Sequence, residues 1–297
     1  TVLGGGSNAI VPDAGVDGLV VEEATRGIER APGGRVRVAA GEDWGRFVDA
    51  MVDASLAGVE CLAGIPGRVG ATPIQNVGAY GQEVADTLVS VEVLARVTGE
   101  ARTFAAAECG FAYRHSRFKD APGAYLVTHV TFGLMPGGPP ARRYAELVRA
   151  TSDDAGLAAV RDTVVALRRR KSMVLDPEDP NRRSAGSFFT NPLVSPLAAA
   201  EARRRSAARG LGEVPAWPQS DGRVKLAAGW LIEKAGLPRG TRRGRVGLSS
   251  AHALALVNHG GASTAELLAF ADDVVQTVRD AFAVELSREP RLLGVDG

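Results

Sequence analysis

Residues 64–81 read Gly-Ile-Pro-Gly-Arg-Val-Gly-Ala-Thr-Pro-Ile-Gln-Asn-Val-Gly-Ala-Tyr-Gly, and this stretch is the most informative in the chain. Glycine recurs along it and two prolines interrupt it, so the pattern predicts loop and turn for much of its length. Ordering so flexible a backbone is costly, and a cofactor pressed against the backbone would explain the composition. A long structural loop is the alternative. The amides of Gln75 and Asn76 are available to read polar atoms of a ligand.

Strand and helix patterns alternate on both sides of this stretch. Strands are expected at 35–40, 88–97, 125–134 and 253–258, and helices at 44–57 (capped by Asp43), 156–170, 195–209 and 264–282. Ser263 and Glu266 form a capping-box pattern at the start of the last helix. The polar, proline-containing segment 176–181 is the best linker, and a second unit is expected to begin near Gly186. The mixture of elements favours an α+β fold over a doubly wound sheet.

Length and composition exclude several classes of protein. The chain has 297 residues, which suggests two domains. Its 35 basic and 34 acidic side chains leave no net field that would favour nucleic acid or an anionic membrane. No apolar run reaches the roughly 18 residues that a membrane span needs. The two cysteines, Cys61 and Cys109, form no disulfide framework, and no metal-binding spacing of histidines or cysteines occurs, so we expect no metal site.

Four further segments contain residues with useful chemistry, and each also has a plainer interpretation. Gly4–Asn8 is either a simple tight turn or a cradle whose backbone N–H groups bind an anion. Arg114 lies among aromatic residues, as a surface arginine or as a fork for a carboxylate. Ser187 is either a buried hydroxyl in a turn or a reactive group, and it does not lie in a G-x-S-x-G elbow. Glu289 is close to the C-terminus, where most carboxylates are solvated.

The start of the chain is unusual for an intact domain. Thr1-Val2-Leu3 runs directly into the glycine turn without a preceding element for that strand to pair with. We therefore expect that the chain is cut inside a domain.

Taken together and in order, these motifs resemble one family, the UDP-N-acetylenolpyruvoylglucosamine reductases (the MurB family). The resemblance covers essentially the whole chain. It is carried by L-G-G-G-S-N (3–8), the 64–81 stretch, C-G-F-x-Y-R-x-S-x-F-K (109–119), A-G-S-F-F-x-N-P (185–192), K-L-A-A-G-W-L-I-E-K-A-G (225–236) and F-x-V-x-L-x-x-E-P-R-x-x-G (282–294). Arg288 stands where the family usually has proline before the C-terminal Glu.

The resemblance implies a fold and an activity. The fold is α+β, with a two-part FAD-binding domain of the PCMH/vanillyl-alcohol-oxidase type and a C-terminal α+β domain for the UDP-sugar. The implied domains are 1–24 (the rest of the first FAD-binding part, to which 284–297 returns), 25–178 and 184–283. The implied reaction uses NADPH to reduce FAD, and the flavin then reduces UDP-N-acetylglucosamine enolpyruvate to UDP-N-acetylmuramate for peptidoglycan. From the lack of a signal peptide and the balanced charge we expect a cytoplasmic protein without nucleic-acid or membrane partners, and we expect a monomer.

The resemblance also implies roles for individual residues. Arg114 holds the substrate carboxylate, Ser187 donates a proton to C2, and Glu289 shares a proton with the enol or orients neighbouring groups. The implied FAD-binding residues are Gly4, Gly5, Gly6, Ser7, Asn8, Gly64, Ile65, Pro66, Gly67, Gly70, Ala71, Gln75, Asn76, Gly78, Ala79, Tyr80 and Gly81. The implied substrate-binding residues are Tyr144, Asn191, Lys171 and Lys225, and the Tyr144 segment indicates the subfamily with a substrate-closing loop.

Two other functions remain open at this point. One is another FAD-dependent oxidoreductase of the same superfamily, such as a hydroxy-acid or sugar oxidase. The G-S-F-F-x-N-P segment and the terminal Glu argue against it, because those oxidases lack them. The other is a non-catalytic UDP-sugar-binding fragment. Flavin absorbance and NADPH consumption with and without the enolpyruvyl substrate discriminate among the three.

Overall fold

The structure, a computed structural model, describes residues 1–294, so the last three residues of the 284–297 segment lie outside the described part. The chain divides into two units. Unit one comprises Thr1–Ser7 and Gly18–Leu175, and unit two comprises Asn8–Asp17 and the chain from Asp176 onward. The expected linker at 176–181 therefore begins where the chain passes from unit one to unit two. The domain limits expected from the sequence stay a prediction.

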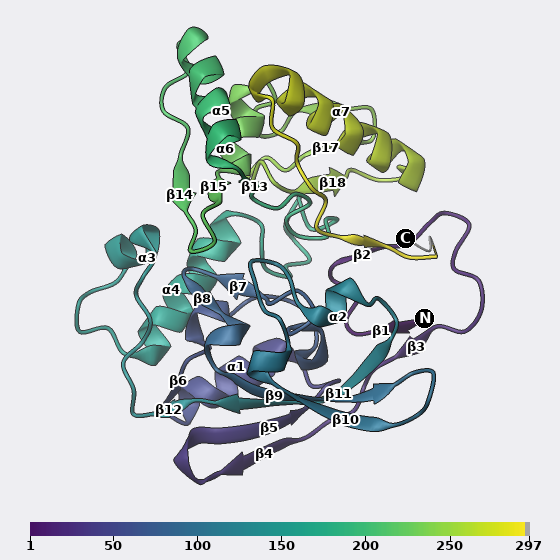
Figure 1. The fold of residues 1–297 in the computed structure, drawn as a ribbon, viewed down its shortest axis with the longest axis vertical. Coiled ribbons are helices and arrows are strands. Elements are labelled where there is room, and N and C mark those ends of the chain that lie inside the picture. Colours follow the sequence, from purple (N-terminus) through teal and green to yellow (C-terminus); the bar gives the residue numbers. More distant parts are fainter. Residues whose placement is uncertain (295–297) are drawn as a thin grey trace. The chain divides into compact units, whose positions relative to one another are not determined.

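Unit one is built on a five-stranded antiparallel sheet (Figure 1). Its strands, in spatial order, are β10 (Ala101–Ala105), β9 (Leu88–Ala95), β11 (Tyr125–Gly133), β5 (Arg35–Ala39) and β4 (Ile28–Ala31). Smaller pairs are β1 (Val2–Leu3) with β3 (Val21–Glu22), β6 (Leu56–Ala57) with β12 (Met135–Pro136), and β7 (Gly78–Ala79) with β8 (Gln82–Glu83). The first pair is parallel, so β1 finds its partner in a strand that follows it in sequence.

Four helices accompany the sheet of unit one. They are α1 (Trp44–Asp53), α2 (Arg117–Asp120), α3 (Ala145–Ala150) and α4 (Leu157–Arg170). Asp43 caps α1 as expected, because its carboxylate accepts from the N–H of Arg46 at 3.0 Å. The expected extension of α1 to residue 57 is wrong. Ser55 has a φ of 57°, and Leu56 and Ala57 leave the helix to pair with β12.

The core of unit one joins α1 to the sheet through aromatic contacts. The rings of Phe47 and Phe132 stack with centroids 4.9 Å apart, and Trp44 is tilted against both. The indole N–H of Trp44 donates to the carbonyl of Leu62 at 3.0 Å, so a buried polar atom is satisfied. Buried Leu167 of α4 belongs to the same core, and α4 therefore holds its C-terminal turn in a fixed place.

In its described part, which ends at residue 294, unit two combines small antiparallel sheets with three α-helices. The sheets have the orders β13 (Leu193–Val194), β15 (Val224–Leu226), β14 (Ala216–Pro218) and β16 (Arg242–Arg243), β17 (Val246–Leu248), β18 (Leu256–Asn258). The helices are α5 (Pro196–Ala208), α6 (Ala228–Lys234) and α7 (Thr264–Phe282). The capping box of Ser263 and Glu266 is confirmed, and α7 has the expected limits.

The two ends of unit two's sequence meet in a short parallel pair. β19 (Arg291–Leu292) pairs with β2 (Ala9–Ile10), and Ile10 is buried in the core of unit two. That core also contains Phe188 and Phe189, the apolar faces of α5, α6 and α7, and buried residues of β15, β17 and β18. The 186–190 segment is therefore held rigidly by its two phenylalanines.

Candidate functional site

The glycine turn near the start of the chain packs directly on the 64–81 loop. A β-carbon on Gly4 would lie 3.3 Å from Cγ of Arg68, and one on Gly5 would lie 3.2 Å from Cα of Gly67. The hydroxyl of Ser7 donates to the carbonyl of Pro66 at 3.2 Å. Side chains at Gly4 and Gly5 would crowd this contact, and the two segments expected to bind a cofactor lie side by side within unit one.

The glycine turn has open space beside Gly6. Gly6 has a φ of 67°, and nothing lies within 4 Å of the position that its β-carbon would take. A backbone turn bare of side chains, next to a second glycine-rich backbone, forms the kind of cradle that an extended phosphate-bearing cofactor needs. The residues present therefore fit FAD, and the anion-cradle interpretation of Gly4–Asn8 stays a prediction.

Hydrogen bonds from the backbone and side chains of the 64–81 loop to neighbouring segments fix the loop's conformation. The N–H of Gly70 donates to the carbonyl of Ala40 at 2.8 Å, and a β-carbon on Gly70 would lie 2.5 Å from that of Ala40. Asn76 is buried, and its amide nitrogen donates to Glu83 at 2.7 Å and to the carbonyl of Ala112 at 3.1 Å. The amide of Asn76 is thus directed at protein groups, so any contact with a cofactor has to come from its backbone.

Arg114 is held beside the same loop in an unusual backbone conformation. Its φ is 53°, in the left-handed region, and its carbonyl accepts from Nζ of Lys119 at 2.9 Å. Its Nη2 donates to the carbonyl of Gly78 at 2.8 Å. Strained backbone that is fixed by several contacts is common where a side chain has to be aimed. The structure thus brings Arg114 to the end of the glycine-rich loop.

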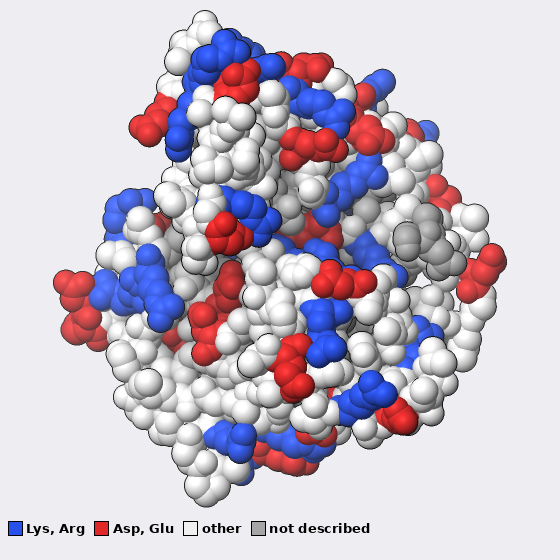
Figure 2. Space-filling model, in the orientation of Figure 1, with Lys and Arg blue, Asp and Glu red and all other residues white. Residues whose placement is uncertain are grey.

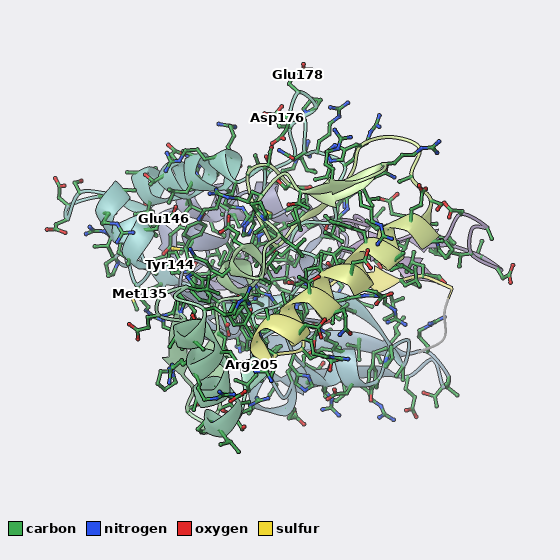
Figure 3. All side chains as sticks on the ribbon, turned by 90° about the horizontal axis from the view of Figure 1, so that it is seen from above. Met135, Tyr144, Glu146, Asp176, Glu178 and Arg205 are labelled. Carbon is green, nitrogen blue, oxygen red and sulfur yellow. The ribbon has the colours of Figure 1, made fainter. Side chains whose placement is uncertain are left out.

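Tyr80 links the loop to the residues expected to bind the substrate. Its ring meets the ring of Tyr144 edge-on with centroids 5.5 Å apart, and Nζ of Lys171 lies 5.4 Å from the centroid of the Tyr80 ring. Lys171 also forms an ion pair with Glu146 at 2.5 Å. Tyr144 and Glu146 lie together at the start of α3 (Figure 3). Burial raises the pKa of Tyr80 to about 12, so its hydroxyl stays protonated.

Two residues of unit one were missed by reasoning from the sequence. Glu60 is completely buried and accepts from the N–H groups of Gly58 and Ala141, both at 2.7 Å. Arg168, in the last turn of α4, has a buried Nε that finds no hydrogen-bond partner among residues 1–294. Neither residue belongs to a motif, because a lone Glu and an arginine in a basic helix end are common in any sequence.

In unit two, a short backbone ladder pairs residues 188–190, which directly follow Ser187, with residues 287–289. The N–H of Glu289 donates to the carbonyl of Phe188 at 2.9 Å, and Phe189 forms an antiparallel bridge with Arg288. Residues 99 and 101 positions apart thereby become neighbours. The side chains of Ser187 and Glu289 are only partly buried, and the hydroxyl of Ser187 makes no hydrogen bond to the described part of the chain. A hydroxyl in this position is available to a ligand.

The remaining expected residues of unit two occupy defined positions. The side-chain oxygen of Asn191 accepts from the N–H of Ala228 at 3.0 Å, at the start of α6. Lys225 lies on the central strand β15, opposite Leu193 on one side and Trp217 on the other. Asn8 donates to the backbone carbonyl of Glu289 at 3.4 Å, so it belongs to unit two although its motif begins in unit one.

The expected site residues therefore fall into two groups. Unit one holds Gly4, Gly5, Gly6, Ser7, Gly64, Ile65, Pro66, Gly67, Gly70, Ala71, Gln75, Asn76, Gly78, Ala79, Tyr80, Gly81, Arg114, Tyr144 and Lys171. Unit two holds Asn8, Ser187, Asn191, Lys225 and Glu289. Their assignment to FAD, substrate or catalysis stays a prediction.

Two general features of the described residues are the distribution of surface charge and the character of the helices. Basic and acidic side chains are interspersed over the displayed face (Figure 2). Among residues 1–294, no helix combines the length and the apolar character that crossing a bilayer requires.

Comparison with known proteins identifies relatives along the whole chain. Residues 1–105 match the family model of an FAD binding domain, and residues 177–293 match that of the UDP-N-acetylenolpyruvoylglucosamine reductase C-terminal domain. Proteins named UDP-N-acetylenolpyruvoylglucosamine reductase from Streptomyces coelicolor and Thermobifida fusca are each 50% identical over 99% of this chain, which covers 79% and 85% of their lengths. The crystal structure of MurB from Thermus caldophilus matches with a TM-score of 0.64 and 27% identity, over 99% of this chain and 85% of that one.

Proposed function

Because the chain belongs to the UDP-N-acetylenolpyruvoylglucosamine reductase family, we propose that it reduces UDP-N-acetylglucosamine enolpyruvate to UDP-N-acetylmuramate with electrons from NADPH. The protein is an FAD-dependent oxidoreductase. The observation that carries the proposal is the 50% identity over 99% of the chain. The resemblance noted in the sequence is thereby confirmed, and so is the α+β fold class.

FAD supplies the redox chemistry when bound, by accepting a hydride from NADPH and passing one to C3 of the enolpyruvyl group. We assign its binding to the cradle of Gly4–Ser7 against Pro66–Gly67 and to the rest of the 64–81 loop. The absence of β-carbons at Gly4 and Gly5 supports the assignment, because it lets backbone N–H groups approach the cofactor.

Arg114 binds the carboxylate of the substrate in this proposal. Addition of hydride at C3 leaves negative charge at C2, which delocalises into the carboxylate. A guanidinium fork that is already aimed stabilises this charge without reorganising. The fixed backbone of Arg114 and its hydrogen bond to Gly78 support such a role, because they limit the directions in which the side chain can point.

Ser187 delivers the proton to C2, and Glu289 assists. A serine hydroxyl is a very weak acid, so it needs a neighbour that orients it or shares the proton. Glu289 is proposed as that neighbour, and the hydrogen bond from its N–H to the carbonyl of Phe188, the residue after Ser187, supports this choice. The buried rings of Phe188 and Phe189 hold the serine in place.

Substrate contacts are proposed for each unit taken by itself. In unit one these are Tyr144 and Lys171, which already lie around Tyr80. In unit two they are Asn191 and Lys225, which lie at the start of α6 and on β15. Ammonium and amide groups are suitable donors to phosphate oxygens.

The cellular setting belongs to the proposal as well. The product is a precursor of peptidoglycan, so we place the enzyme in cell wall biogenesis, and through it in the maintenance of cell shape and in cell division. We further propose a cytoplasmic monomer that has neither nucleic acid nor membrane as a partner. The balanced charge of the chain supports the absence of a nucleic-acid partner.

Steady-state NADPH oxidation by the FAD-loaded protein tests the proposed function. We expect oxidation to require UDP-N-acetylglucosamine enolpyruvate and to yield UDP-N-acetylmuramate in equal amount, as identified by mass spectrometry. Oxidation that proceeds at the same rate with oxygen and no enolpyruvyl substrate would instead assign the protein to the flavin oxidases.

A further inference from the structure

Glu60 is a buried acidic residue that the proposed reaction does not use. It is completely buried, and both of its carboxylate oxygens accept hydrogen bonds. One oxygen accepts from the N–H of Gly58 at 2.7 Å, and the other accepts from the N–H of Ala141 at 2.7 Å and from the amide of Gln82 at 3.3 Å. A carboxylate is tolerated in the interior where such donors replace its lost hydration. The carboxylate of Glu60 therefore fixes the segments that supply these donors.

Ala141 is held through both of its backbone polar atoms. Its N–H donates to Glu60, and its carbonyl accepts from the thiol of Cys61 at 3.1 Å. The two residues before Ala141 are prolines, which have no N–H, so Ala141 offers the first backbone donor after them. In the described part of the chain, residues 138–143 belong to no helix or strand, so contacts of this kind decide where the segment lies. Glu60 and Cys61 thus form a clamp on Ala141.

The clamped segment leads directly to Tyr144. Just after the clamp, the guanidinium of Arg142 donates to the hydroxyl and to the carbonyl of Thr151 at 2.9 and 3.1 Å. These contacts join the segment to the end of α3, so they hold together the part of the chain that carries Tyr144. The clamp on Ala141 joins the same part to the buried segment Glu60–Leu62 in the core of unit one.

Glu60 also holds the residue that follows the 64–81 loop. The amide nitrogen of Gln82 donates to Glu60, while the amide oxygen of Gln82 accepts from the N–H of Cys61 at 2.9 Å. Gln82 is itself buried and belongs to β8, which pairs with β7 of the loop. The end of the cofactor loop and the start of the Tyr144 segment are therefore attached to the same two residues.

The two attached segments also meet directly. A β-carbon on Gly81, which has a φ of 82°, would lie 3.1 Å from Cβ of Arg143. The rings of Tyr80 and Tyr144 meet edge-on in the same region. Tyr144 is 47% exposed, so packing alone does not fix the direction of its hydroxyl. That direction depends on where the backbone of the clamped segment is held.

We propose that Glu60 and Cys61 position Tyr144 for the phosphate groups of the sugar substrate by holding Ala141 at both of its polar atoms. They are positioning residues, because both are completely buried and cannot reach a ligand. The inference rests on the proposed function, in which the hydroxyl of Tyr144 contacts the substrate. If the clamp is weakened, Tyr144 is in place for only a fraction of the time, and the apparent dissociation constant rises by the inverse of that fraction. The rise can be no larger than the loss caused by removing Tyr144 itself.

The test is the equilibrium dissociation constant of UDP-N-acetylmuramate, measured by calorimetric titration of the FAD-loaded protein without NADPH. Glu60→Gln keeps the size of the side chain but replaces one of the two accepting oxygens with a donor. We expect it to raise the dissociation constant at least about tenfold, as the loss of a hydrogen bond to a carboxylate does. The value of kcat at saturating substrate should change much less, because the phosphate groups take no part in the reaction.

Cys61 supplies a matched pair of variants. Cys61→Ala removes the thiol donor, whereas Cys61→Ser keeps a donor of similar size. We expect Cys61→Ala to raise the dissociation constant about two- to threefold, because a thiol donates a weak hydrogen bond, and Cys61→Ser to equal the wild type. Val36→Ala, in the buried part of β5, is the control for a general loss of stability and should keep the wild-type dissociation constant.

A double-mutant cycle shows whether the clamp acts through Tyr144. Tyr144→Ala should itself weaken binding. Adding Glu60→Gln to Tyr144→Ala should then change the dissociation constant by less than about twofold, because the clamp no longer has a tyrosine to position. An effect of Glu60→Gln that is equally large with and without Tyr144 would overturn the inference.

Two further results would also overturn it. One is a wild-type dissociation constant in Glu60→Gln or, where that protein does not retain FAD, in Cys61→Ala. The other is a wild-type dissociation constant in Tyr144→Ala, which would remove the tyrosine from the proposed site. Failure of the proposed function would look different, because the wild-type protein itself would then not bind UDP-N-acetylmuramate.

Discussion

Replacing Ser187 by alanine separates the chemistry of the proposed site from its structure. The hydroxyl makes no hydrogen bond within the described residues, and the segment is held by the buried rings of Phe188 and Phe189 and by the N–H of Phe188, which donates to Leu254 at 2.6 Å. Removing one partly exposed oxygen should therefore change the free energy of unfolding by no more than about 0.5 kcal/mol. A loss of activity then reports on proton delivery.

The size of that loss follows from general-acid catalysis. Removing a positioned proton donor usually slows a step about 10²–10⁴-fold, which raises its barrier by about 3–5 kcal/mol. Stopped-flow absorbance of the flavin separates the two half-reactions. Reduction by NADPH should keep its wild-type rate, because it requires no proton at C2. Reoxidation by the enolpyruvyl substrate should slow by the full factor, and Ser187→Cys should retain more activity than Ser187→Ala, because a thiol with a pKa of about 8.5 still donates.

Two results would refute this reasoning. Reoxidation of the Ser187→Ala flavin at the wild-type rate would remove the serine from the mechanism. Equal slowing of both half-reactions would indicate that the side chain has a structural role.

Three further predictions follow from other contacts. Arg114→Lys keeps the charge but loses the planar fork and the bond to Gly78, so kcat should fall about 10²–10³-fold with little change in UDP affinity, and an unchanged kcat would exclude the carboxylate role. Glu60→Ala leaves the N–H groups of Gly58 and Ala141 without an acceptor, so urea denaturation should show a loss of about 2–6 kcal/mol, whereas the exposed control Glu100→Ala should lose almost nothing. Burial raises the pKa of Cys61 to about 12 and of Cys109 to about 11, so both thiols should resist a thiol reagent at about pH 8.5 until the protein is unfolded. Because the pKa of each thiol is higher in the folded protein, the contribution of the two thiols to the free energy of unfolding is complete below about pH 9 and falls as the pH rises toward 12. Rapid labelling of the native protein would contradict the burial.

The sequence predicts those elements whose pattern is strong over many residues. The last helix has a capping box and a regular apolar stripe, and its limits match the structure. Helix α1 ends earlier than its apolar pattern predicts, because Ser55 adopts a left-handed backbone conformation that serine does not usually favour. The edge strands β4 and β10 were missed, since both are short and largely exposed and thus lack the alternation of a half-buried strand.

The candidate site shows the same division. Glycine-rich and aromatic motifs pointed to the 64–81 loop, Arg114 and the 185–192 segment, because special backbone geometry restricts the residues allowed there. Arg168 and Glu60 gave no such signal, since their importance lies in burial and in the atoms around them. The pairing of the segment after Ser187 with the segment that contains Glu289 likewise joins residues about 100 positions apart. A local sequence pattern cannot predict such a pairing.

The most direct test of the central claim is anaerobic reoxidation of the reduced flavin. FAD-loaded protein is reduced with one equivalent of NADPH and then mixed with UDP-N-acetylglucosamine enolpyruvate in the absence of oxygen. The account predicts that the visible absorbance of oxidised flavin returns as one equivalent of UDP-N-acetylmuramate forms. A flavin that stays reduced with the enolpyruvyl sugar and recovers only when oxygen is admitted would contradict it.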